Sequence, residues 1–96
     1  MDGEPYSNPD AMRKIKAIAS MGHLAFSNHA LKEMAIDHIC EVDAMNVLRA
    51  GWMDEPAEEK NGTWRYRVRT RKFVVVIAFR SDEVLAIVTA WRLGKS

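Results

Sequence analysis

The apolar residues in the first half of the chain have helical spacing. Asn8, Pro9 and Asp10 form a typical helix start, with a cap, a proline at the first helical position and an acid in the first turn. Gly22 is placed to end this helix. The pattern therefore predicts a helix to about residue 20, whose buried face consists of Ala11, Ile15, Ile18 and Ala19.

Two further helices follow before the periodicity changes. Ser27 is a typical N-cap for a helix to about residue 36. Residues 40–43 open another helix, which Gly51 ends, and residues 23–26 are either a short strand or an extended link. The spacing predicts that these helices bury Leu31, Met34 and Ala35, and Val42, Met45 and Leu48.

After residue 51 the pattern changes to a period of two residues, which is typical of strands. Asn61-Gly62 predicts a tight hairpin between strands at 52–59 and 63–70. A second hairpin is expected from the apolar runs 73–80 and 84–93. The predicted fold is α+β, with N-terminal helices packed on a C-terminal antiparallel sheet of about four strands in a single domain over residues 1–96, of which 1–7 are expected to be disordered.

Composition and charge indicate the cellular compartment and the class of partner to expect. No apolar run is long enough for a membrane span, and the acidic N-terminal stretch does not resemble a signal peptide. Cys40 is the only cysteine, which favours a reducing compartment, so we expect a cytoplasmic protein without a membrane partner. Residues 1–60 carry six basic against eleven acidic side chains, and residues 61–96 carry eight against two. This asymmetry indicates either contact with nucleic acid or acidic segments packed over basic ones.

The stretch TWRYRVRTR at residues 63–71 concentrates the positive charge. As a strand it places its four arginines on one face. Counting back from the hairpin turn puts Glu58 opposite Arg65 and Asp54 opposite Arg69, which favours an internally paired face. The alternative is a phosphate-binding face, because Arg67, Arg71, Lys72 and Arg80 have no evident partner, while Arg92 lies on a different strand.

Aromatic and histidine residues also have two interpretations. Trp64, Tyr66 and Trp91 either stack on unpaired bases or belong to the core of the sheet. His29 falls in the first turn of its helix, where the dipole favours a neutral imidazole that accepts a proton, or else it packs beside the sheet. The spacing of His38 and Cys40 does not match a zinc site, so no metal and no cofactor is expected.

The segments FSNHALKEMAIDHICEVDAMNVLRAG and VVVIAFRSDEVLAIVTAWR resemble small bacterial proteins grouped with the RelE-like toxins and the barnase, EndoU, colicin and RelE nuclease fold. The leading helix is similar to that of the motility quorum-sensing regulator mRNA interferases. The resemblance covers about residues 8–93. Ser27, His29 and Ala30 match its helix-start motif, and Thr89 and Arg92 match its last strand, whereas Glu33 and Asp37 stand where the family often has arginine and His38 where it has glycine.

This resemblance implies a toxin-type endoribonuclease that cleaves RNA without a metal, by attack of the 2′-hydroxyl to form a cyclic phosphate. Its partners would be RNA, an antitoxin protein and the ribosome. The alternative is a non-catalytic module that binds RNA or protein on the same fold. The catalytic residues expected are His29, Arg67, Arg92 and Tyr66, and the RNA-binding residues expected are Arg65, Arg69, Arg71, Lys72, Arg80 and Thr89.

Overall fold

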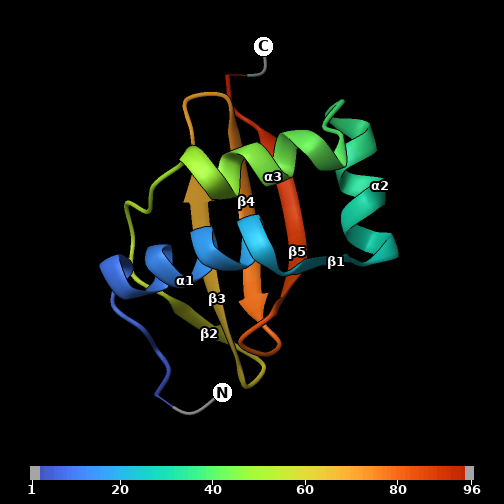
Figure 1. Cartoon of the computed structure of the whole chain (residues 1–96). Coiled ribbons are helices and arrows are strands. Elements are labelled where there is room, and N and C mark those ends of the chain that lie inside the picture. Colours follow the sequence, from blue (N-terminus) through green and yellow to red (C-terminus); the bar gives the residue numbers. More distant parts are fainter. Residues whose placement is uncertain (1–2, 95–96) are drawn as a thin grey trace.

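The structure, a computed structural model, describes residues 3–94 as three helices and a five-stranded sheet (Figure 1). The α+β class is therefore confirmed. None of the helices within residues 3–94 has the length and apolar character that a membrane crossing requires. In chain order the elements are α1 (Asn8–Met21), β1 (His23–Phe26), α2 (Asn28–Ile36), α3 (Glu41–Ala50), β2 (Glu58–Lys60), β3 (Thr63–Arg69), β4 (Phe73–Phe79) and β5 (Val84–Arg92).

The sheet is mixed, with the strand order β1-β5-β4-β3-β2. Four strands are antiparallel neighbours, as expected, but residues 23–26 add a fifth strand that pairs in parallel with β5. The predicted strand at 52–59 is shorter than expected: only residues 58–60 form β2, and Trp52 makes an isolated bridge to Arg69. The Asn61-Gly62 turn has φ values of 53° and 80°, the left-handed backbone that this dipeptide tolerates.

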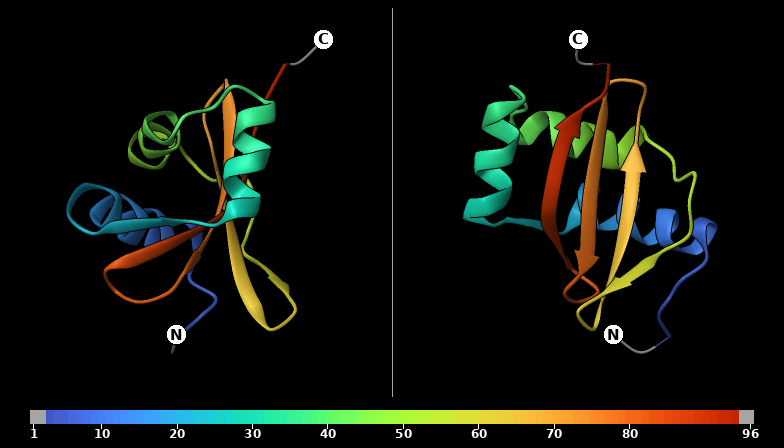
Figure 2. Two further views of the ribbon diagram at one scale, coloured as in Figure 1. Left: turned by 90° about the vertical axis from the view of Figure 1, so that its right-hand side faces the viewer. Right: turned by 180° about the vertical axis from the view of Figure 1, so that it is seen from behind.

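Helices α1 and α3 cover one face of the sheet, while α2 stands at its β5 edge (Figures 1 and 2). The edge position leaves α2 a narrow buried stripe of Ala30 and Met34. Leu31 and Val42, which were expected to face inward, are 39% and 61% exposed. The helical period was read correctly, but the width of the buried stripe depends on where the helix lies on the sheet.

Capping residues fix where the helices begin and end. Ser7, one residue before the predicted cap, accepts a hydrogen bond from the Asp10 amide at 3.3 Å. Ser27 caps α2 as predicted, with its hydroxyl accepting from the Ala30 amide at 3.0 Å. Gly22 follows α1 where the chain passes the turn before β5, and a Cβ on Gly22 would lie 2.4 Å from the Glu83 carbonyl oxygen. This close approach requires glycine and lets β1 start beside β5.

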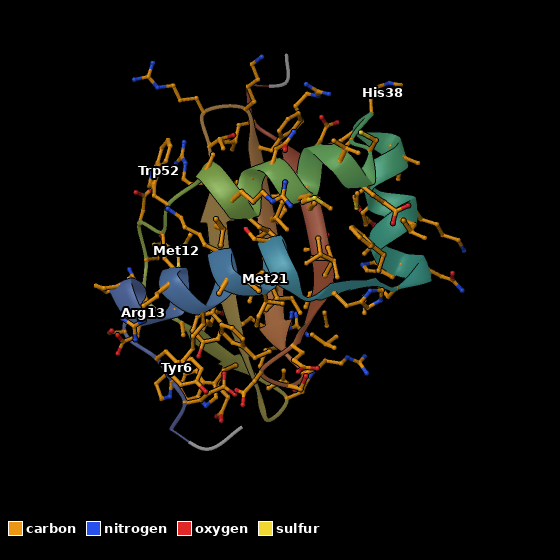
Figure 3. The ribbon with its side chains drawn as sticks, viewed as in Figure 1. Tyr6, Met12, Arg13, Met21, His38 and Trp52 are labelled. Atoms are coloured by element: carbon orange, nitrogen blue, oxygen red, sulfur yellow. The ribbon has the colours of Figure 1, made fainter. Side chains whose placement is uncertain are left out.

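The segment before α1 packs on the end of the core. The Tyr6 ring lies 6.2 Å from that of Tyr66 and 5.3 Å from that of Phe79, and Figure 3 shows Tyr6 beneath α1. The Tyr66 hydroxyl donates to a Glu4 carboxylate oxygen at 2.8 Å and accepts from the Tyr6 amide at 3.1 Å. Of the segment expected to be disordered, residues 1–2 lie outside the described residues, whereas residues 3–7 include these contacts.

Candidate nucleic-acid interface on the uncovered face of the sheet

Strand β3 divides its side chains between two surroundings. Tyr66 and Val68 are fully buried in the core against the helices. Arg65, Arg67 and Arg69 alternate with them and therefore point to the opposite face. Seen from behind in Figure 2, this face of β3, β4 and β5 has no described helix over it. We call it the uncovered face.

A β-bulge in β5 decides which of its residues reach the uncovered face. Val76 pairs with Thr89 and Ile77 with Ile87, so Val88 is an extra residue in β5. The shift places Thr89 on the face opposite the buried Ile87, where an unbroken alternation would put both on the same side. Thr89 and Trp91 consequently lie on the uncovered face.

The strand register aligns these residues in two rows. Arg67, Val76 and Thr89 are cross-strand neighbours in one row. Arg69, Val74 and Trp91 form the next. Val74 and Val76 are only 4% and 8% exposed although no described helix covers them, and their neighbours in these rows have longer side chains. The face therefore has an apolar floor and a polar rim.

Two adjoining pockets of about 170 and 160 Å³ lie on this floor and share Glu55, Arg67 and Trp91 in their walls. We call the two together the groove. Its charged residues are four cations and three carboxylates: Lys60, Arg65, Arg67 and Arg69, and Asp54, Glu55 and Glu58.

Two of the arginines pair with carboxylates of the segment before β2. An Arg69 nitrogen lies 3.3 Å from an Asp54 oxygen, which confirms the expected pair. An Arg67 nitrogen lies 3.5 Å from a Glu55 oxygen, so Arg67, which had no evident partner in the sequence, also has one. Both pairs are well exposed to solvent, and such pairs contribute about 0–1 kcal/mol, so an anionic ligand is able to displace the carboxylates. Arg67 also lies over the Trp91 ring, 5.5 Å from its centroid.

Arg65 and Glu58 differ from these pairs. They are direct cross-strand neighbours, as the hairpin count predicted. Within residues 3–94, however, no ion pair joins them, and the buried Nε of Arg65 has no hydrogen-bond partner. Both side chains line the 170 Å³ pocket. Among the described residues, Arg65 and Glu58 therefore line one pocket without forming an ion pair with each other.

Three predicted RNA-binding cations lie at the ends of the strands. Arg71 and Lys72 are exposed in the turn between β3 and β4, and Arg80 is exposed after β4. Because β4 runs between these two positions, they mark opposite ends of the sheet (Figure 1). The structure thus brings Arg65, Arg67, Arg69 and Thr89 together, and leaves Arg71, Lys72 and Arg80 outside the groove walls.

Tyr66, a reserve candidate for proton transfer, lies on the covered side of β3. It is fully buried, and burial raises the pKa of its phenol well above the usual value near 10. Its hydroxyl is already bonded to Glu4 and Tyr6. Tyr66 therefore does not share a surface with the arginines of the groove.

Arg92 also points away from the groove, since it alternates with Trp91. Its guanidinium donates to the carbonyl oxygens of Asp37 and His38, both at 3.0 Å, and its centre lies 4.8 Å from the centroid of the Phe73 ring. Its amide donates to an Asp37 carboxylate oxygen at 2.8 Å. Figure 3 shows His38 at the end of α2, so Arg92 fastens the C-terminus of that helix to β5.

His29 lies exposed in the first turn of α2. That helix stands at the β5 edge, and β5 is itself two strand spacings, about 10 Å, from β3. His29 lines neither pocket of the groove. The four residues predicted as catalytic are therefore distributed over three places in the fold: Arg67 in the groove, His29 at the start of α2, and Tyr66 and Arg92 on the covered side.

The sequence placed Glu58 opposite Arg65 and Lys60 beside the hairpin turn and assigned no role to Glu55, yet all three residues form walls of the groove. The hairpin register was the signal that placed Glu58 beside Arg65.

Among residues 3–94, no three histidine, cysteine, aspartate or glutamate side chains are grouped so that they hold a metal ion.

Comparison with known proteins identifies a family. A search of the curated proteins found no match to the chain, and neither did a search of the solved structures. These comparisons name no RelE-like protein, so the resemblance to RelE-like toxins stays a prediction. Residues 26–92 match a family described as a domain of unknown function (DUF4258). Because the match covers more than two thirds of the chain, the chain belongs to the DUF4258 family.

Proposed function

We propose that the protein binds RNA in the groove on the uncovered face of its sheet. The observation that carries the proposal is the grouping of Lys60, Arg65 and Arg67 with Trp91 around one pocket on a face that no described helix occupies. Guanidinium groups hold phosphate through two parallel hydrogen bonds, and aromatic rings on a sheet stack on unpaired bases. The cations and the ring therefore suit the two chemical parts of a single RNA strand.

The resemblance to RelE-like toxins supports the same proposal. It implies a protein that acts on RNA in the cytoplasm, with or without the ribosome, and that an antitoxin inhibits. An antitoxin segment laid over the uncovered face would compete with RNA for Arg65 and Arg67. Because the carboxylates of the groove already neutralise part of its charge, we expect moderate affinity that falls as salt rises.

Fluorescence anisotropy with a labelled, unstructured single-stranded RNA tests this proposal. Replacing both Arg65 and Arg67 by alanine is expected to weaken binding about tenfold or more. The slope of log K against log salt concentration is expected to become shallower by about 0.7 for each lost phosphate contact. The matched control is Arg13→Ala on α1, where Arg13 pairs with Asp10 away from the groove. Binding that ignores salt, or an equal loss in the control, would contradict the proposal.

A second candidate function is metal-independent endoribonuclease activity. The observation that favours it is the Glu55 carboxylate 3.5 Å from the Arg67 guanidinium in the groove. Glu55 would take the proton of the 2′-hydroxyl as its oxygen attacks phosphorus. Arg67 would stabilise the charge on the phosphorane, and the leaving 5′-oxygen would take a proton from water. Of the catalytic set predicted from the sequence, this mechanism uses Arg67.

Cleavage is tested with purified protein, RNA and a chelator. The expected products carry 2′,3′-cyclic phosphate and 5′-hydroxyl ends, and both Glu55→Gln and Arg67→Ala are expected to abolish them. His29→Ala is the informative comparison, because loss of cleavage in that variant would indicate that His29 in α2 takes part in catalysis. Induced expression provides a cellular assay: growth arrest relieved by Arg67→Ala supports the candidate, and harmless expression together with intact RNA rejects it.

A further inference from the structure

The 170 Å³ pocket of the groove contains two side chains whose hydrogen-bonding capacity is unused. Arg65 keeps a buried Nε–H without an acceptor in the described chain, although Glu58 is its direct cross-strand neighbour. Glu58 makes no ion pair with any described residue. Because this Nε is buried, a ligand in the pocket would instead accept hydrogen bonds from the terminal N–H groups of Arg65, which forms no ion pair with any described residue.

Phosphate alone does not suit this pocket. The carboxylates of Glu55 and Glu58 stand in its wall with Lys60, Arg65 and Arg67, and they repel an anion. An ionised carboxylate only accepts hydrogen bonds, so its ligand partner must be a group of N–H or O–H donors. The pocket therefore matches a ligand that carries an anion at one end and a pair of donors at the other.

Among the RNA bases, guanine presents such a pair of donors. Its N1–H and its N2 amino group lie side by side on the Watson–Crick edge, in position for the two oxygens of one carboxylate. Adenine and cytosine present one amino group there, and uracil presents one ring N–H. Unpaired bases in single strands expose this edge to proteins, whereas a duplex conceals it.

The remaining wall of the pocket supplies a surface for stacking. The Arg67 guanidinium lies over the Trp91 ring, 5.5 Å from its centroid, and both residues line the pocket together with Glu58. Bases stack on arginine planes as well as on aromatic rings. The volume of about 170 Å³ is below the 300–1,000 Å³ typical of drug-sized ligands, which fits one base better than a complete nucleotide.

We infer that the pocket binds an unpaired guanine of single-stranded RNA, with its Watson–Crick edge on the Glu58 carboxylate, its plane on the Arg67–Trp91 stack and its phosphate on Arg65 and Lys60. The inference rests on the proposed RNA binding and adds a base preference to it. It also explains why a groove for a polyanion contains carboxylates.

The experiment compares two labelled single-stranded RNAs of A, C and U that differ only at a central position, guanine in one and adenine in the other. The native protein is expected to bind the guanine RNA on the order of tenfold more tightly, the discrimination typical of a bidentate base contact. Glu58→Gln is expected to remove this preference and to bind the adenine RNA at least as tightly as the native protein, because it loses a negative charge. Glu58 is exposed, so the variant is expected to fold.

The matched control is Glu59→Gln, the same change on the next residue of β2, whose side chain points to the other side of the strand. The control is expected to keep the guanine preference. Equal, salt-dependent binding of both RNAs overturns the guanine inference and leaves the proposed function standing. A preference that survives in Glu58→Gln also overturns it. Binding of neither RNA overturns the proposed function and the inference together.

Discussion

The two faces of the sheet are built from alternate residues of the same strands, yet their polar side chains differ in how fully they are hydrogen-bonded. On the covered face, Tyr66 is buried and its hydroxyl is bonded to the N-terminal segment. On the uncovered face, its neighbour Arg65 has a buried guanidinium Nε without a hydrogen-bond partner among the described residues, and Arg67 is held by an exposed ion pair and by its contact with Trp91. Satisfied buried polar groups stabilise a fold, whereas exposed, weakly paired cations are accessible to a ligand. Under the proposed function, the covered face therefore stabilises the fold and the uncovered face binds RNA.

The largest expected effect is on the covered face. Ile77→Ala removes a fully buried side chain and is expected to lower the free energy of unfolding by about 2–5 kcal/mol. Its control is Thr89→Ala on the uncovered face, where a half-buried position is expected to cost less than about 1 kcal/mol. Denaturant titration measures both, and similar losses would remove the distinction between the faces.

Tyr66→Phe tests the contribution of the Tyr66 hydroxyl, which is fully hydrogen-bonded on the covered face. Loss of the hydroxyl removes its hydrogen bonds with the Tyr6 amide and the Glu4 carboxylate and is expected to cost about 1–3 kcal/mol at neutral pH.

The same variant has a pH signature. Burial raises the pKa of Tyr66 above its usual value near 10, so in alkali the folded state keeps a proton that the unfolded state loses. The free energy of unfolding must then fall as pH rises above about 10, and that of the Tyr66→Phe variant is expected to fall less steeply. Equal alkaline slopes for the two proteins would contradict this assignment.

Arg92→Ala and Arg67→Ala separate the two roles of arginine. Arg92 bonds two carbonyls at the end of α2, so its loss is expected to lower stability by about 1 kcal/mol and to leave RNA affinity unchanged. Arg67→Ala is expected to weaken RNA binding and to leave the stability of the fold unchanged. Thermal melting and anisotropy on the same two variants check the prediction, and weaker RNA binding by folded Arg92→Ala would restore Arg92 to the site.

The smallest expected effect lies at the start of α3, remote from the groove. The Cys40 amide donates to an Asp43 carboxylate oxygen at 3.0 Å and lowers the pKa of Asp43, helped by the Cys40 thiol. This stabilisation is present above the usual pKa near 3.8 and is lost as pH falls through the lowered pKa. Asp43→Asn is expected to cost about 0.5–1 kcal/mol at pH 7 and less in acid. A deficit that does not shrink in acid would show that the charge is not the cause.

Local chemistry explains which features the sequence predicted. The alternation of Tyr66 and Arg67 already implied one apolar and one cationic face, and Ser27 and Asn61-Gly62 marked a cap and a turn. These features depend on residues that lie within a few positions of each other.

Features that depend on distant partners were not predictable in this way. The pairing of β1 with β5 joins residues 61 positions apart, His23 with Val84, and no local pattern encodes it. The bulge at Val88 moves Thr89 and Trp91 onto the uncovered face, and a period of two cannot foresee an extra residue. The carbonyls that engage Arg92 follow the end of α2, more than fifty residues earlier in the chain, so no local pattern around Arg92 indicated these hydrogen bonds.

The position of β5 between β1 and β4 has a consequence for biosynthesis. Among the described strands, β5 is synthesised after the other four, and it supplies Thr89 and Trp91 to the groove. A nascent chain therefore cannot assemble that groove until translation has passed these residues. Pairings this distant in sequence also form slowly compared with local ones. If the groove binds RNA as proposed, an unfinished chain would be unable to engage the message from which it is being made.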